Sequence, residues 1–237
     1  MKTKYILFDK DGTLLDFEKY WIRILIAATE SVLSRFDIDI KIAEEIYPAI
    51  GVVDGVADIS GPYCQGDIAV TVDIYYDIIL SHGHNIDKDE FTSALAEEFK
   101  DNSSAGELTG NCEDVKGFLM NLRKSAIKVA LVTADDTHST NECLALAGIE
   151  DCFDRIFVAD GGYPGKPDPH IINMLCAEEG IEKDEMLMVG DTVKDMLFAK
   201  NGGIRAIAIA KSETNRRILE PYAVAVVDSP DKIIEYM

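Results

Sequence analysis

The 237-residue sequence contains no apolar run approaching the roughly 18 residues that a membrane-spanning helix needs. The N-terminal stretch carries two lysines, but its apolar run of four residues is too short for a secretory signal peptide. We therefore expect a cytoplasmic protein that does not bind membranes. The length fits one large domain, or a core domain with a smaller partner.

Cysteine and basic residues are also scarce. The five cysteines are odd in number and widely spaced, which argues against a disulfide framework or a zinc site. Only 23 lysines and arginines stand against 43 acidic residues, so the formal net charge is −20. Nucleic acid needs a basic surface and is excluded as a partner. A small anionic substrate is still possible, because one metal ion or lysine can reverse the field inside a pocket.

Short, nearly continuous apolar stretches recur along the chain and are typical of strands buried on both faces of a parallel sheet. They cover residues 5–9, 128–134, 155–160, 185–191, 205–210 and 223–228. Helical patterns separate the stretches from about residue 108 onward. This alternation predicts a doubly wound α/β domain.

The region 17–107 departs from this alternation and is predicted to be a helical insert. Apolar residues at steps of three or four predict an amphipathic helix over 17–36. Further helices are expected over 40–49, 68–81 and 88–100, although β-branched residues also make 68–81 compatible with a strand. The expected domains are a core of 1–16 with 108–237, and an insert of 17–107.

The stretch Asp9-Lys10-Asp11-Gly12-Thr13 admits two interpretations, a calcium loop or a phosphoryl-transfer site. An EF-hand loop starting at Asp9 needs glycine at its sixth position and glutamate at its twelfth, where this chain has Leu14 and Tyr20. The preceding residues also read as a strand instead of a helix. The calcium interpretation therefore fails.

Polar residues follow several of the predicted strands. Asp9, Thr133, Asp160 and Asp191 each stand at the end of one. In open α/β sheets ligands bind beyond the carboxyl ends of the strands, and neighbouring strands are about 4.8 Å apart. These side chains are therefore expected to converge on one small group.

An aspartate that attacks a phosphate dianion must overcome charge repulsion. At about 3.5 Å and an effective dielectric of about 20, the repulsion is roughly 9 kcal/mol. A divalent cation and a lysine are needed to offset it. Asp191 offers a hard oxygen ligand for Mg²⁺, and Lys166 offers a positive charge. Thr133 offers a hydroxyl and the adjacent amide of Ala134 to the phosphate, while Asp11 could move a proton.

Four ordered segments carry a family resemblance. They are DKDGT at 9–13, LVTAD at 131–135, GKPDP at 165–169 and GDTVKD at 190–195. With these segments the sequence resembles the haloacid-dehalogenase-like hydrolase superfamily, in its phosphoglycolate-phosphatase-like branch. The resemblance implies a Rossmann-like parallel sheet with helices on both faces, and a mobile helical cap inserted after the first strand.

The resemblance also implies roles for the site residues. Asp9 is the implied nucleophile, Asp11 the acid/base, and Lys166 the cation that stabilises nucleophile and phosphate. Thr133 is the implied phosphate ligand. The implied ligands of Mg²⁺ are the carboxylates of Asp9 and Asp191 and the backbone carbonyl of Asp11, with Asp195 just outside them.

The second segment departs from the family pattern. Many relatives have asparagine directly after the phosphate-binding residue, whereas this chain has Ala134, Asp135 and Asp136. Lys10 is expected to point away from Asp9 and Asp11 by strand alternation, and we assign it no role.

The sequence thus predicts a Mg²⁺-dependent phosphatase that hydrolyses a small phosphorylated metabolite through an aspartyl-phosphate, acting as a monomer or homodimer. A phosphomutase of the beta-phosphoglucomutase type and a non-catalytic phosphate-binding or signalling protein are the alternatives. His82 and His84 are expected to face solvent. We hypothesise that the Gly/Pro-rich loop 55–67 lies over the active site and recognises the leaving group of the substrate.

Overall fold

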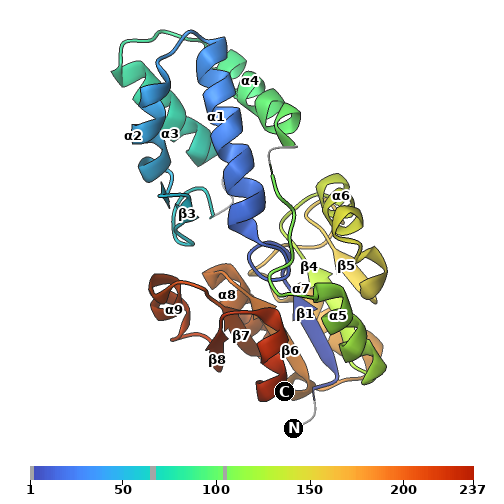
Figure 1. Ribbon diagram of the computed structural model, residues 1–237. Helices are drawn as coiled ribbons and strands as arrows, with labels where there is room; N and C mark the ends of the chain where they lie inside the picture. The colour runs from blue at the N-terminus through green and yellow to red at the C-terminus, as the bar shows by residue number, and fades with distance from the viewer. Residues whose placement is uncertain (1–2, 65–67, 104–105) are drawn as a thin grey trace. The chain divides into compact units, whose positions relative to one another are not determined.

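The chain divides into two compact units, one formed by residues 1–16 with 108–237 and the other by residues 17–107 (Figure 1). The computed structural model describes residues 3–64, 68–103 and 106–237. Within these ranges no helix combines the length and the apolar character that crossing a bilayer requires.

The first unit contains a six-stranded sheet in the order β5-β4-β1-β6-β7-β8, and every neighbouring pair is parallel. Its strands are β1 (Tyr5–Phe8), β4 (Lys128–Val132), β5 (Arg155–Phe157), β6 (Met186–Gly190), β7 (Arg205–Ile209) and β8 (Ala225–Val227). All residues of β1 and β6 are buried. The predicted α/β class with a parallel sheet is confirmed.

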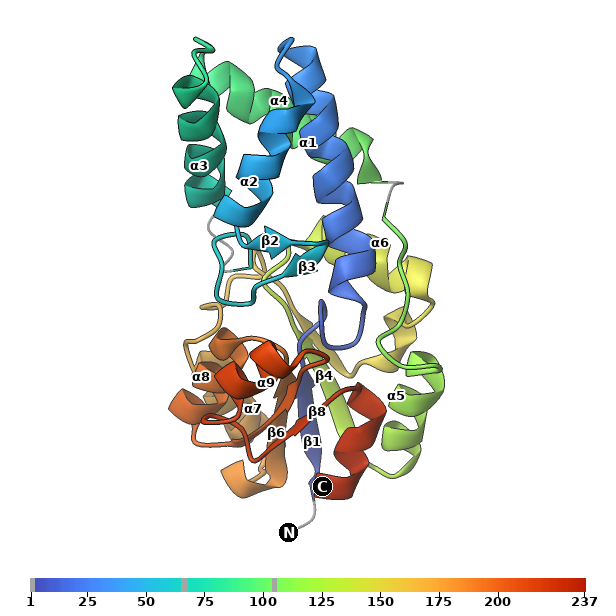
Figure 2. The ribbon, with the colours of Figure 1, turned by 60° about the vertical axis from the view of Figure 1, so that its left-hand side comes forward.

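Helices cover the sheet on both sides (Figure 2). α8 packs on β6 and β7 and also touches α7, whereas α5 packs on β4 and touches the C-terminal η6. The helices of this unit are α5 (Val115–Lys124), α6 (Thr137–Ala147), η4 (Glu150–Cys152), α7 (His170–Glu179), η5 (Lys183–Glu185), α8 (Val193–Gly202), α9 (Glu213–Leu219) and η6 (Pro230–Tyr236).

Local sequence explains where these helices begin and end. The Asp136 side chain caps α6 by accepting from the Ser139 amide at 2.8 Å. The same helix stops at Gly148, whose φ of 64° suits glycine. At α8, Thr192 and Asp195 form a reciprocal capping box. This box places the Asp195 side chain at the carboxyl edge of the sheet.

The second unit, residues 17–107, is mainly helical. Its elements are η1 (Glu18–Ile22), α1 (Arg23–Arg35), η2 (Ile40–Ile42), α2 (Ala43–Ala49), β2 (Val52–Val53), β3 (Val56–Ala57), α3 (Ile68–Ser81) and α4 (Lys88–Asp101). α1 packs along α4, and α2 packs against α3. The predicted helix over 68–81 is therefore present.

This unit has its own core, in which Leu25, Val32, Tyr75 and Phe91 are fully buried. The Tyr75 hydroxyl shares a hydrogen bond of 2.7 Å with Thr29, so the polar tip of the buried ring is satisfied. The helical insert therefore carries a hydrophobic core separate from the one around the sheet.

Candidate active site

The carboxyl ends of three strands meet at one edge of the sheet. β1 lies between β4 and β6, and Phe8 stands opposite Leu131 on one side and Val189 on the other. Asp9 follows β1 directly, and its amide donates to the Val189 carbonyl at 2.9 Å. The strand order reverses between β1 and β6, which is the place where doubly wound sheets bind their ligands.

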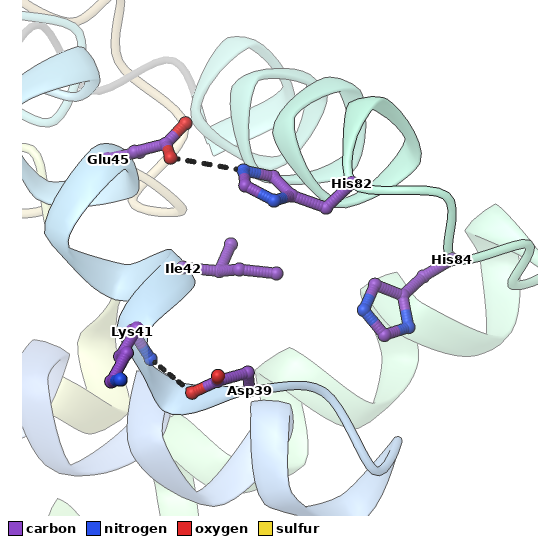
Figure 3. A pocket seen from close by; sticks show the side chains of 6 residues that line it. All are labelled: Asp39, Lys41, Ile42, Glu45, His82 and His84. Atoms are coloured by element: carbon purple, nitrogen blue, oxygen red, sulfur yellow. Dashed lines mark hydrogen bonds and ion pairs between the residues drawn. The ribbon is translucent and has the colours of Figure 1, made fainter.

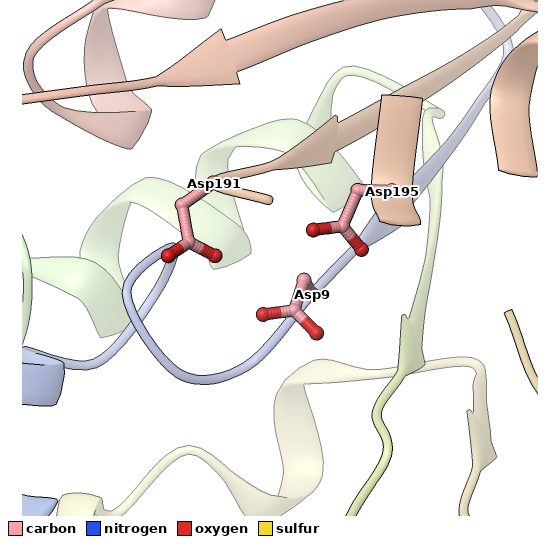
Figure 4. A group of neighbouring side chains, drawn as sticks. All are labelled: Asp9, Asp191 and Asp195. Carbon is pink, nitrogen blue, oxygen red and sulfur yellow. The ribbon is translucent and has the colours of Figure 1, made fainter. Parts of the chain in front are cut away.

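Three carboxylates gather at this edge (Figure 4). Asp9, Asp191 and Asp195 each offer an oxygen, and these oxygens all lie within 4.8 Å of one another. The oxygens of Asp195 already have partners, because Oδ2 accepts from the Thr192 hydroxyl at 2.6 Å and Oδ1 accepts from Lys166 at 2.6 Å. Asp9 and Asp191 are therefore better placed than Asp195 to hold a cation.

Lys166 brings a buried ammonium group into this cluster. Its Nζ donates to Asp9 Oδ1 at 2.5 Å as well as to Asp195. Burial lowers the pKa of Lys166, but Asp195 and Asp9 outweigh it and raise the pKa above its ordinary value. Lys166 is therefore charged at neutral pH, and it bridges the residue after β1 to the first turn of α8.

The carboxylates outnumber the positive charge beside them. Burial, opposed by Lys166 and assisted by the negative charge of Asp195, raises the pKa of Asp9 to about 7. Burial and the neighbouring Asp9 and Asp195 also raise the pKa of Asp191 well above its ordinary value. A hard divalent cation bound by oxygen ligands would relieve this repulsion, so the donor set fits an ion such as Mg²⁺.

Gly12 lets the loop after β1 pass close to Asp191. A Cβ atom at Gly12 would lie 2.0 Å from Asp191 Oδ2, and its φ of 77° is one that side-chain-bearing residues rarely adopt. The next residue, Thr13, donates its hydroxyl to Asp191 Oδ1 at 3.2 Å. Gly12 and Thr13 therefore have a structural role: Gly12 leaves room for the Asp191 carboxylate, and Thr13 donates a hydrogen bond to it.

Thr133 and Ala134 follow β4, as the sequence predicted. Thr133 is buried, its amide donates to the Phe157 carbonyl at 3.0 Å, and its hydroxyl accepts from the Asp135 amide at 3.2 Å. Ala134 is exposed. Their role in binding phosphate stays a prediction. Asp160 follows β5 after a short turn and accepts from the Thr137 hydroxyl at 2.7 Å, so it helps to hold the start of α6.

Asp11 lies outside the carboxylate group. Its predicted bond to a metal runs through the backbone carbonyl and stays a prediction. Our expectation for Lys10 was wrong, because its Nζ lies 2.8 Å from Asp11 Oδ2. Strand alternation does not apply here, since β1 ends at Phe8 and Lys10 already belongs to the following loop.

His82 and His84 line a cavity of about 220 Å³ in the helical unit, together with Asp39, Lys41, Ile42 and Glu45 (Figure 3). His82 Nε2 lies 3.1 Å from Glu45 Oε1. Within the described ranges, neither histidine joins a group of three close metal-ligating side chains. Both are partly or fully exposed, consistent with the expectation that they face solvent.

The hypothetical leaving-group loop 55–67 falls partly outside the described residues, which omit 65–67. Its first residues contribute β3, and Asp58 then accepts from the Ser60 amide at 2.8 Å. A role in reading the leaving group stays a prediction for the part that is described.

Fold and site together define an α/β protein with a carboxylate–lysine centre at the carboxyl edge of a doubly wound sheet. A family model for haloacid dehalogenase-like hydrolases matches residues 3–203. The chain belongs to this family of hydrolases, which confirms the predicted family and the prediction of an enzyme.

Similar proteins align over most of the chain. A phosphoglycolate phosphatase of Vibrio vulnificus (strain CMCP6) is 30% identical over 211 residues, which is 87% of this chain and 83% of that protein. The pyrophosphatase PpaX of Bacillus velezensis is 25% identical over 234 residues, covering 98% of this chain and 92% of that protein.

Solved structures share the fold. A candidate phosphoglycolate phosphatase from Haemophilus somnus 129pt superimposes with a TM-score of 0.72 at 19% identity, covering 100% of this chain and 98% of the other. A candidate beta-phosphoglucomutase from Thermotoga maritima gives a TM-score of 0.71 at 22% identity, covering 99% of this chain and 98% of the other. At these identities the likeness supports the architecture only.

Proposed function

We propose that the protein is a Mg²⁺-dependent phosphatase that hydrolyses a small-molecule phosphate monoester through an aspartyl-phosphate. The observation that carries the proposal is the convergence of Asp9, Asp191 and the Lys166 ammonium at the switch point of the sheet. A nucleophile, a cation site and a fixed positive charge are what phosphoryl transfer to a carboxylate requires.

In the proposed first step, a carboxylate oxygen of Asp9 attacks phosphorus and the ester P–O bond breaks. The departing oxygen takes a proton from the Asp11 carboxyl group and leaves as an alcohol. Water then attacks phosphorus, Asp11 takes its proton, and the bond between Asp9 and phosphorus breaks. Asp11 thereby regains its proton, and inorganic phosphate is the second product.

The charges in the site suit these steps. Mg²⁺ held by Asp9, Asp191 and the Asp11 carbonyl would neutralise negative charge on the phosphoryl oxygens. Lys166 contacts Asp9 directly and keeps its carboxylate beside a positive charge. Thr133 and the Ala134 amide would bind phosphoryl oxygens from the neighbouring strand end. The unit 17–107 would act as a cap that excludes bulk water during the first step.

The named relatives support the class of substrate. Phosphoglycolate phosphatase and pyrophosphatase are the names printed for proteins that align with most of this chain. Both names describe hydrolysis of small phosphorylated compounds, and we extend that class to this protein.

A screen of phosphate esters with and without Mg²⁺ tests the proposal. We expect release of inorganic phosphate from at least one small ester with MgCl₂ present, and none in EDTA. The Asp9→Asn protein measures contaminating activity. Product analysis with a hexose phosphate separates hydrolysis from the phosphomutase alternative, which would yield an isomeric sugar phosphate. No turnover of any ester, or equal turnover in EDTA, would contradict the proposal.

Mg²⁺ should also stabilise the folded protein. A ligand that binds only the folded state raises the free energy of unfolding, by about 2.7 kcal/mol at a concentration 100 times its Kd. We therefore expect millimolar MgCl₂ to raise the Tm by several degrees.

The Asp191→Asn variant should lose most of this shift, because it removes one carboxylate of the cation site. Asp184→Asn, at an exposed acidic residue of η5, is the matched control and should keep the full shift. The idea fails if Asp191→Asn responds to MgCl₂ as strongly as the wild type does.

A further inference from the structure

Lys10 is a charged residue with no exposed surface. Its side chain is 0% accessible, and its Nζ lies 2.8 Å from Asp11 Oδ2 and 2.8 Å from Asp135 Oδ2. Both partners reach the surface, with 15% and 26% of their side chains accessible. An ammonium group is costly to bury and is tolerated when carboxylates surround it. Lys10 therefore joins two partly exposed carboxylates from inside the protein.

The two carboxylates come from different segments. Asp11 belongs to the loop after β1, whereas Asp135 belongs to the turn between β4 and α6. Asp135 is well anchored, because its amide donates to Thr133 at 3.2 Å, its carbonyl accepts from Ala159 at 2.8 Å and its carboxylate accepts from Ser139 at 3.3 Å. Lys10 therefore connects Asp11 to the turn that carries Thr133.

The backbone of Lys10 is held as well. Its carbonyl accepts from the amides of Leu14 and Leu15, each at 2.9 Å. The Asn111 side chain donates to the carbonyls of Gly12 and Thr13 at 2.5 and 3.1 Å. The loop that carries Asp11 is therefore fixed on its backbone, and the ammonium of Lys10 restrains the Asp11 side chain.

We infer that Lys10 and Asp135 are positioning residues that hold the Asp11 carboxyl group in place for proton transfer to the leaving group. The inference rests on the proposed function, in which Asp11 is the acid/base. It also gives a reason for Asp135, whose carboxylate is the second one beside the buried ammonium of Lys10.

The physical basis is orientation. Acid–base catalysis by a placed side chain contributes about 10²–10⁴-fold in rate, and a misplacement of about 1 Å can remove about 10²-fold. Loss of the contact to Lys10 would remove a restraint on the rotation of the Asp11 carboxyl group about its side-chain bonds. Proton transfer would then fail more often, while Asp9, Lys166 and the cation site would be unchanged.

A purely structural role of Lys10 makes a different prediction. Disturbed packing would slow all substrates alike, whereas loss of proton delivery slows only esters whose leaving group needs a proton. The p-nitrophenolate ion leaves without protonation, but an alkoxide requires it. The value of kcat/KM reports the first phosphoryl transfer, so the ratio of kcat/KM between the two esters isolates the function of Asp11.

The test compares p-nitrophenyl phosphate with a simple alkyl phosphate in wild-type protein and in Lys10→Met, which keeps a similar side-chain length. For Lys10→Met we expect kcat/KM to fall about 10–100-fold on the alkyl ester but less than about 3-fold on p-nitrophenyl phosphate. Lys10→Arg should recover part of the loss. Lys200→Met removes an exposed lysine on α8 and should leave both values unchanged.

Asp135→Asn provides a second variant if Lys10→Met does not fold. It keeps the shape of the side chain but removes the second charge. We therefore expect kcat/KM to fall several-fold on the alkyl ester and to change little on p-nitrophenyl phosphate. Equal losses on both esters, or no loss in either variant, would overturn the inference. In that case the proposed function stands as long as Asp9→Asn is inactive. The alkyl ester is taken from those that the screen shows to be hydrolysed, and if the wild type hydrolyses no ester of that screen, the proposed function and the inference fail together.

Discussion

Replacing Asp9 with asparagine should reduce phosphate-ester hydrolysis by about 10⁴-fold or more, because the amide cannot act as the nucleophile. The substitution changes little else, since asparagine has nearly the same shape and Lys166 keeps its contact with Asp195. The measurement is phosphate release at saturating substrate and MgCl₂. Asp184→Asn should retain full activity. Turnover by Asp9→Asn near the wild-type rate would exclude an aspartyl-phosphate at this position.

The same variant should be more stable than the wild type when no metal is present. The pKa of Asp9 is raised from 3.8 to about 7, so the folded protein holds this proton more tightly than the unfolded chain does. The free energy of unfolding therefore falls as the pH rises from about 4 through about 7. Asparagine does not titrate, so in Asp9→Asn this contribution to the fall in the free energy of unfolding is absent.

In EDTA, the Tm of Asp9→Asn should exceed that of the wild type by a few degrees at about pH 8, and the difference should shrink at about pH 5. Thermal unfolding at both pH values checks this. If the variant is less stable than the wild type at the higher pH, repulsion among the site carboxylates does not destabilise the metal-free wild type, and the prediction is wrong.

Replacing Lys166 with methionine should lower both activity and stability. The buried ammonium touches Asp9 at 2.5 Å and Asp195 at 2.6 Å, so its loss leaves two close carboxylates without a shared cation. Removing one member of a buried ion pair typically destabilises a protein by about 3–5 kcal/mol. Activity should fall as well, because the positive charge beside the nucleophile disappears.

Thermal unfolding in EDTA at about pH 8 measures the stability change of Lys166→Met, and the loss should be smaller at about pH 5, where Asp9 takes up a proton. Lys200→Met, at an exposed position of α8, should stay close to the wild type. A Tm for Lys166→Met within about one degree of the wild-type value would mean that the buried bridge has no net effect on stability.

The strands and their common edge could be predicted because they depend on local patterns. β1 and β6 are buried on both faces and read as unbroken apolar runs, and parallel pairing then brings their carboxyl ends together. β5 is shorter than predicted and ends at Phe157 instead of reaching Asp160. The apolar pattern continued past the point where pairing with β4 stops, since β4 also ends there at Val132.

Two features escaped prediction for different reasons. The β2–β3 hairpin turns at Asp54 and Gly55, both with positive φ. The sequence did carry a signal for this hairpin, because an Asp-Gly pair between two valines is typical of a tight turn between strands. The bridge from Lys10 to Asp135 had no such signal. It joins side chains from different segments, and only the folded arrangement of β1, β4 and α6 brings them together.

The central position of β1 affects how the protein is synthesised. Asp9 and Lys166 are 157 positions apart in the chain. At roughly 5–20 residues per second, the ribosome takes about 8–30 s between the two. During this delay β1 has emerged while β6, one of its two neighbours in the sheet, is still to be made. The helical insert emerges in between and has a hydrophobic core of its own, so it could fold before the sheet that carries the site is complete.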